Sequence, residues 1–157
     1  YTCFLNGNEN ACTPEMFVRY AQIAALMPVM QFSASPWRVL PEADFQKVKA
    51  ALALREKCLP EIFKAVECAK VTGEPIARSM EFVFPGQGME RVMDQFMVGE
   101  DLLVAPVWKQ GEVVRSVTLP EGQWRCVSLG ETEGDVLNGG RNVVLGENDG
   151  LVVLRRV

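Results

Sequence analysis

The run QFMVGEDLLVAPV, from Gln95 to Val107, decides the fold of this 157-residue chain. Apolar residues precede a glycine and two acids, and an apolar stretch then follows that Pro106 closes. A short apolar run bounded by turn residues is typical of a buried strand. We therefore expect a short buried strand here, with a turn on each side.

The residues around this run also alternate between apolar and polar, with turn signals every 8 to 12 or so positions. Short strands at this spacing are typical of an antiparallel β-sandwich. The alternation begins after Gly73, so we expect β-structure from there onward. The expected strands are Ile76–Phe84, Leu102–Ala105, Val113–Leu119, Gln123–Val127, Asn142–Leu145 and Leu151–Arg155.

The residues before Gly73 have a helical pattern. Thr13, Pro14 and Glu15 predict a helix start, because they supply a hydroxyl cap, a proline at the first helical position and an acid in the first turn. We expect this helix to run to Met27, where Pro28 ends it. Its residues are apolar around most of the circumference, which predicts burial on several sides.

A second, longer helix is expected from Pro41 to Thr72, with Gly73 as its stop. Val29–Phe32 predicts a short strand between the two helices, and Ser35–Arg38 a loop. Pro60 lies inside the helical pattern and predicts a kink or a division into two helices. One face of the pattern carries Phe45, Val48, Leu52 and Leu59.

Composition excludes several classes of function. The chain is 48% hydrophobic, has a net charge of −4 and has no histidine. It therefore offers no basic surface for nucleic acid, no run long enough for a membrane span, and no Ser-His-Asp, Cys-His or histidine-based metal site. We expect no cofactor and no metal. Five cysteines without CxxC spacing predict reduced thiols that act as small apolar residues.

Acidic and aromatic residues are the remaining candidates for chemistry. Glu100 and Asp101 are adjacent, so in a strand they would point to opposite faces and could not act together on one bond as a catalytic pair. We interpret them as structural. Trp37 follows a proline in a loop and could either stack on a sugar or close the core. Trp108 and Trp124 are predicted to be packing residues, and Arg78 an ion-pair or carbonyl donor that fixes its strand.

Several ordered motifs resemble the C-terminal part of a retaining α-glycosidase of glycoside hydrolase family 31. Besides Gln95–Val107, they include FVRYAQIAALMPVMQFS at Phe17–Ser33, Leu54-Arg55 with Leu59–Phe63, Thr72–Arg78 and Leu119–Trp124. Cys58 and Glu61 depart from the family's usual Leu-Leu-Pro-Tyr run. The resemblance implies an α+β chain in which the last βα units of a (β/α)8 barrel precede an antiparallel β-sandwich.

The resemblance also divides the chain and places candidate site residues. Residues 1–73 would be the end of the barrel and residues 74–157 the proximal sandwich. Barrel active sites lie at the C-terminal ends of the strands, which here are the Tyr1–Thr13 loop and the Gln31–Trp37 segment. Gln31, Ser33 and Trp37 are the implied substrate-binding residues, with Ser33 where the family commonly has a histidine. The catalytic aspartates would precede Tyr1 and match no residue here, so no catalytic residue is assigned.

Three functions follow from these observations. The first is a part of an α-glycosidase that acts on an α-linked glycoside or oligosaccharide and is inactive alone. The second is a carbohydrate-binding or interaction module derived from the same fold, and the third a structural remnant without activity. The nearly all-apolar first helix favours the first, and it predicts a homo-oligomer through an exposed apolar barrel-end surface. With no targeting signal visible, we expect a cytoplasmic location.

Overall fold

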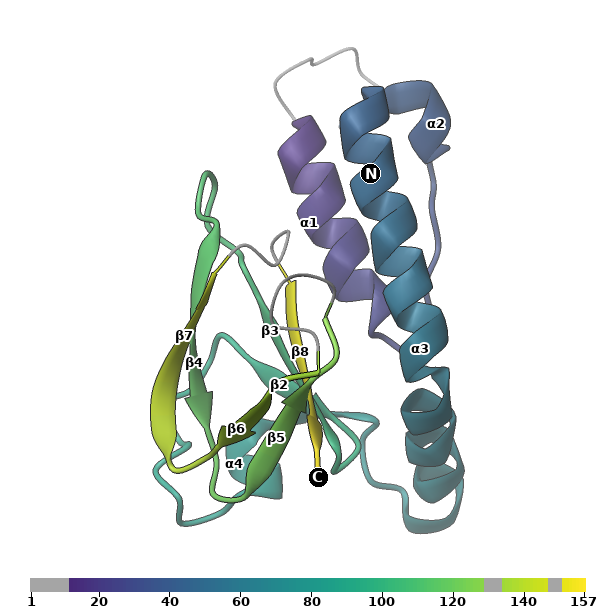
Figure 1. The fold of residues 1–157 in the computed structure, drawn as a ribbon. Coiled ribbons are helices and arrows are strands. Elements are labelled where there is room, and N and C mark those ends of the chain that lie inside the picture. Colours follow the sequence, from purple (N-terminus) through teal and green to yellow (C-terminus); the bar gives the residue numbers. More distant parts are fainter. Residues whose placement is uncertain (1–11, 129–133, 147–150) are drawn as a thin grey trace.

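The computed structural model describes residues 12–128, 134–146 and 151–157. Two long helices lie beside a β-sheet structure (Figure 1). The helices are α1 (Pro14–Ala25), α2 (Pro36–Val39), α3 (Glu42–Thr72) and α4 (Met80–Val83). The strands are β1 (Ala77–Ser79), β2 (Phe96–Val98), β3 (Leu102–Pro106), β4 (Val114–Leu119), β5 (Gln123–Cys126), β6 (Val136–Asn138), β7 (Arg141–Gly146) and β8 (Leu151–Arg156).

Two antiparallel sheets form the β part. Six strands pair in the order β1-β2-β3-β8-β5-β6, and β4 pairs with β7 in a second sheet. Trp124 is fully buried in the core between the two sheets, and its indole N–H donates to Pro120 O at 3.0 Å. This arrangement confirms the expected antiparallel β part of the chain and the packing role of Trp124.

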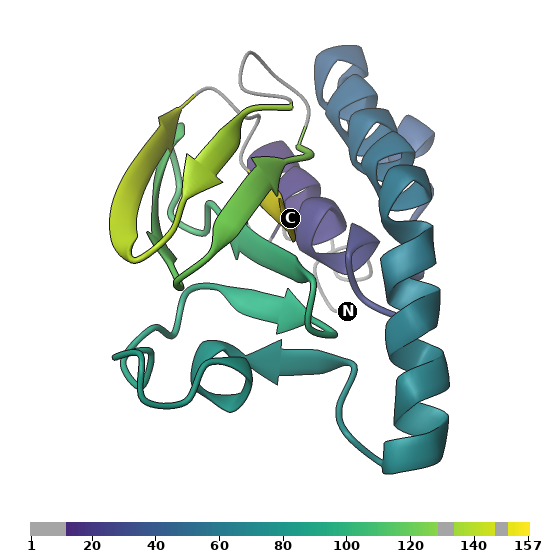
Figure 2. The same cartoon turned by 60° about the horizontal axis from the view of Figure 1, so that its bottom comes forward.

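The opposite face of the larger sheet is covered by helices. Figure 2 shows α1 between the strands and α3, as does Figure 1. Neighbouring residues of a strand point to opposite faces. Leu103 therefore joins the core between the sheets, while Leu102 joins the core beneath α1 and α3. Both faces are covered along β3 and along the first four residues of β8, so these residues are apolar without alternation.

The run Gln95–Val107 forms a β-hairpin rather than one strand. Gly99, at φ 59°, turns the chain between β2 and β3, and its N–H donates to Ile76 O at 2.8 Å. A Cβ at this position would lie 3.1 Å from Ala65 Cβ in α3, so both the positive φ and the close approach of hairpin and helix favour glycine. The buried Gln95 amide bonds both backbone groups of Thr118 in β4 and thereby ties the two sheets together.

Helix α1 begins as expected and ends two residues earlier than expected. The Thr13 hydroxyl accepts a hydrogen bond from Met16 N at 3.2 Å. The helix packs on α3 and on the central strands, which confirms burial on more than one side, but Met16 and Tyr20 remain more than half exposed.

The connection from α1 to α3 differs from the prediction. Residues 29–32 form no strand, because no strand of the described chain pairs with them. The Ser35–Arg38 segment was expected as a loop, yet Pro36–Val39 forms the single helical turn α2. Proline at the first helical position favours such a turn.

Helix α3 is one continuous helix across Pro60, so the alternative of two helices is wrong. Gly73 caps it in the left-handed region at φ 76°, as expected. Of the residues expected on the buried face, Val48 and Ile62 are buried, but Leu52 is exposed, so the observed face only partly coincides with the expected one. The observed face consists of Val48, Ala51, Leu54, Cys58, Ile62 and Ala65.

Two further expectations are wrong in the β part. The predicted strand Ile76–Phe84 is interrupted after Ser79, because the Ser79 hydroxyl accepts from Phe82 N at 3.3 Å and starts α4. Trp108, expected to pack, is 60% exposed in the connection between β3 and β4. The strands β2 and β6 were not predicted as separate elements.

Candidate functional site

The candidate substrate-binding residues lie on the connection between α1 and α3. Gln31 and Ser33 are exposed in its irregular part, and Trp37 is 68% exposed in α2. The structure therefore places all three side chains on one short surface segment, where solvent reaches them. Amide, hydroxyl and indole groups can together hydrogen-bond and stack on a sugar.

Two apolar side chains hold this segment against the helices. The rings of Phe32 and Phe17 stack with parallel planes at a centroid distance of 6.0 Å. Met30 is half-buried against the cores beneath α1 and α3. Because Met30 and Phe32 point inward, the neighbouring Gln31 and Ser33 are left facing outward.

A guanidinium holds the polar backbone of the same segment. Arg55, on α3, donates to the carbonyl oxygens of Ala25 at 2.7 Å, Met27 at 2.6 Å and Pro28 at 3.2 Å. The sequence did not predict these bonds, since Arg55 is 27 to 30 positions away in the chain. The available signal was an arginine on the helix face that otherwise carries buried apolar residues.

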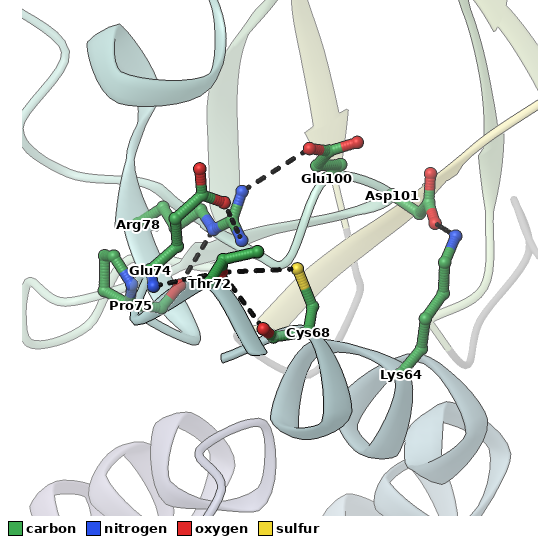
Figure 3. A network of polar contacts seen from close by, with 8 residues as sticks. All are labelled: Lys64, Cys68, Thr72, Glu74, Pro75, Arg78, Glu100 and Asp101. Atoms are coloured by element: carbon green, nitrogen blue, oxygen red, sulfur yellow. Dashed lines mark hydrogen bonds and ion pairs between the residues drawn. The ribbon is translucent and has the colours of Figure 1, made fainter. Parts of the chain in front are cut away.

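A second polar cluster lies where α3 meets the hairpin (Figure 3). The Arg78 side chain, 3% exposed, lies 2.9 Å from the Glu74 carboxylate and 3.6 Å from that of Glu100, and its Nε donates to Pro75 O at 2.8 Å. This confirms the expected role of Arg78 as an ion-pair and carbonyl donor. It also confirms Glu100 as a structural residue, although the residue lies in a turn and not in a strand.

Asp101 points to a different partner. Its carboxylate pairs with Lys64 of α3, and this hydrogen bond raises the pKa of the Lys64 ammonium. The neighbouring acids Glu100 and Asp101 thus neutralise two separate cations. They do not face each other as the two carboxylates of a glycosidase must.

A shallow recess of about 100 Å³ lies between these two ion pairs, lined by Cys68 and Gly99 among others. The Cys68 thiol lies 3.8 Å from the Thr72 hydroxyl. Because each charged side chain that lines the recess has an ion-pair partner, we interpret the recess as part of the joint between α3 and the sheet. Within residues 12–128, 134–146 and 151–157, no three His, Cys, Asp or Glu residues are grouped to hold a metal ion.

The described cysteines fit their expected role. Cys58 and Cys126 are buried, as expected of small apolar residues, whereas Cys12 and Cys68 are partly buried. Cys3 lies outside the described residues. None of the helices described in the structure is both long and apolar enough to span a membrane.

The comparisons with known proteins agree on one protein family. Residues 73–146 match the glycosyl hydrolase family 31 C-terminal domain. The myogenesis-regulating glycosidase of Mus musculus is 38% identical over 76% of this chain and 17% of its own length. An α-glucosidase of Saccharolobus solfataricus is 30% identical over 90% of this chain and 20% of its own length. The chain thus spans at most about a fifth of these two relatives.

Solved structures agree with the sequence relatives. A family 31 α-xylosidase from a soil metagenome, complexed with xylose, superimposes with a TM-score of 0.79 at 27% identity, over 94% of this chain and 25% of that one. The cycloalternan-forming enzyme of Listeria monocytogenes, in complex with a pentasaccharide, gives 0.82 at 28% identity, over 92% of this chain and 15% of that one. The chain belongs to glycosyl hydrolase family 31, and its β part is the C-terminal domain of that family.

Proposed function

We propose that this chain is the part of a retaining α-glycosidase that ends the catalytic barrel and continues into the sandwich behind it. In this proposal residues 1–73 complete the barrel, and residues 74–157 form the sandwich that braces it. The chain supplies no catalytic carboxylate and is inactive alone. Gln31, Ser33 and Trp37 contribute to the binding of an α-linked glycoside or oligosaccharide.

The observation that carries the proposal is the core shared by the helices and the larger sheet. Leu54 and Ile62 of α3 pack in one buried cluster with Val104 and Val153 of the sheet. A cluster of this kind orients α1 and α3 rigidly on the sandwich. The match to the family 31 α-xylosidase supports the proposal, because it spans 94% of this chain and thus reaches beyond residues 73–146.

The activity is tested by comparing this chain with the full-length protein that contains it. We expect the 157-residue chain to release no aryl group from p-nitrophenyl α-glycosides above a buffer blank. The full-length protein should hydrolyse at least one of them and release the α-anomer first, which proton NMR detects. Turnover by the chain alone, or a β-anomer as first product, would contradict the proposal.

The binding residues are tested in the same full-length protein. Trp37→Ala should raise KM by about tenfold, because stacking on a sugar ring is lost. Trp108→Ala is the matched control, since Trp108 is similarly exposed but lies on the sandwich, in the β3–β4 connection. Equal KM values for the two variants would remove Trp37 from the substrate site.

The alternative function is a carbohydrate-binding or structural module without catalysis. The exposure of Trp37 at 68% is compatible with it. Binding of maltooligosaccharides by the 157-residue chain, measured by calorimetry, together with an inactive full-length protein, would favour this alternative.

A further inference from the structure

The C-terminal end of α1 presents backbone carbonyls that the helix itself cannot satisfy. The last carbonyls of any α-helix have no intrahelical partner, and they carry a partial negative charge. The last turn of α1 has no basic residue that could answer this charge. Arg55 supplies the missing cation from α3, through its bonds to Ala25 and Met27.

The Arg55 side chain also reaches beyond the helix end. Its Nη2 donates to Pro28 O at 3.2 Å, so one guanidinium bonds three carbonyl oxygens between Ala25 and Pro28. Residues 30–32, which follow, belong to no strand of the described sheets. Ladder hydrogen bonds from those sheets therefore do not fix this segment, and Arg55 fixes the point from which it departs.

We propose that Arg55 is the positioning residue for the substrate-binding segment that carries Gln31 and Ser33. This inference rests on the proposed function. The planar guanidinium donates in fixed directions, which suits three carbonyls at different angles, whereas the ammonium of a lysine is a single point of charge. Arg55 acts through the backbone of Met27 and Pro28 and is not itself placed in contact with the sugar.

The first test uses the full-length protein and a p-nitrophenyl α-glycoside that it hydrolyses. Arg55→Met should raise KM about tenfold and leave kcat within about twofold, because Gln31 and Ser33 bind the substrate while the catalytic carboxylates lie elsewhere. Arg55→Lys keeps the charge but not the fork, and it should recover only part of the loss.

Arg155→Met is the matched control. Arg155 joins the same helix to the sheet, with its Nε 2.6 Å from the Glu61 carboxylate, but it does not bond residues 25–28. The Arg155→Met variant loses a contact between α3 and the sheet but keeps the Arg55 contacts. It therefore shows the effect of lowered stability alone, and we expect its KM to equal that of the wild type. A KM for Arg55→Met that matches the Arg155→Met value would overturn the proposal.

The second test measures amide hydrogen exchange in the same proteins and does not depend on activity. Arg55→Met should accelerate exchange at residues 29–34 by about tenfold, with no change in β3 and β8. Unchanged exchange at residues 29–34, or equal acceleration in Arg155→Met, would overturn the positioning role. If the wild-type protein hydrolyses no α-glycoside, the proposed function fails, and exchange alone then decides whether Arg55 holds the segment.

Discussion

Two buried arginines, Arg78 and Arg115, each have several polar partners. Arg78 has two carboxylates and a carbonyl around it, and Arg115 of β4 donates to Ser116 O and Asp94 O and pairs with the Asp94 carboxylate at 2.8 Å. A guanidinium loses its hydration on burial, so several bonds are required to compensate it. Apart from Ser116 of β4, these partners lie in connections between helices and strands, which the arginines thereby attach to the core.

The first prediction concerns Arg78. Arg78→Met should lower the free energy of unfolding by about 2 kcal/mol, because three polar contacts of a buried group are lost. The cost stays below that of breaking a fully buried pair, since Glu74 and Glu100 remain hydrated. Urea titration followed by circular dichroism measures the change. The exposed Arg91 provides the control Arg91→Met, and equal midpoints for the two variants would contradict the assigned role.

The second prediction concerns the pH dependence of stability at Cys58. Burial, and after it the negative charge of Glu61, raises the pKa of this thiol from 9.0 to about 11. The folded state therefore holds its proton more tightly than the unfolded state. The resulting contribution is complete below pH 9 and is lost as the pH rises through about 11, and it amounts to about 2 to 3 kcal/mol at most.

The variant Cys58→Ala isolates this effect. The stability difference between wild type and variant should shrink between about pH 9 and about pH 11, since groups common to both proteins cancel. Denaturant titrations at a series of pH values measure it. A difference that stays constant over this window would show that the thiol does not titrate as described.

At the scale of the elements, the connection between β6 and β7 leaves no room for a side chain at Gly139. A Cβ on Gly139 would lie 1.8 Å from Pro120 O, and the Gly139 N–H donates to Gly122 O at 2.7 Å. Gly139→Ala should therefore cost about 3 kcal/mol or more, because the obstacle is backbone. Gly88→Ala, at φ 74° with nothing within 4 Å, is the control and should cost about 1 kcal/mol. Thermal unfolding of both variants tests the difference, and similar values would contradict the steric account.

Elements with local signals were predictable from the sequence. Thr13 and Gly73 mark helix ends by their own side-chain or backbone chemistry, and both were placed correctly. The segment 29–32 was not, because a strand also needs a neighbour that local sequence cannot supply. Ser79 shows the converse case, since its hydroxyl starts a helical turn inside an apolar run that reads as a strand.

The candidate site also has one part that was predictable from the sequence and one part that was not. The positions of Gln31, Ser33 and Trp37 came from the family motif, and their binding role stays a prediction. The contact of Arg55 with Ala25 and Pro28 depends on how α3 lies against α1, so only the structure reveals it. For Trp108, the local sequence did not indicate whether the ring would pack in the core or, as observed, face solvent in the connection between β3 and β4.

For the whole molecule, both long helices carry exposed apolar residues in the described part of the chain. Tyr20 of α1 is 69% exposed and Phe63 of α3 is 61% exposed. We expect the 157-residue chain to self-associate through these helices, because burial of such side chains is favourable. Sedimentation velocity at tens of micromolar should detect species larger than one chain.

A charged double variant tests which surface is responsible. Tyr20→Lys combined with Phe63→Lys should shift the chain towards the monomer. Val144→Lys, at a residue 70% exposed on β7, should leave the association unchanged. A wild-type chain that sediments as a stable monomer would contradict the expectation for this surface.

The position of β8 has a consequence for how the protein is made. This strand is the last of the described chain, yet it lies between β3 and β5 in the middle of the larger sheet. During translation, the strands β1 to β3 and the pair β5–β6 emerge first. No strand joins these two parts of the sheet by hydrogen bonds until residues 151–157 leave the ribosome. A nonsense mutation just before Leu151 would therefore remove the centre of the sheet rather than its edge, and the nascent protein would stay a substrate for chaperones and proteases.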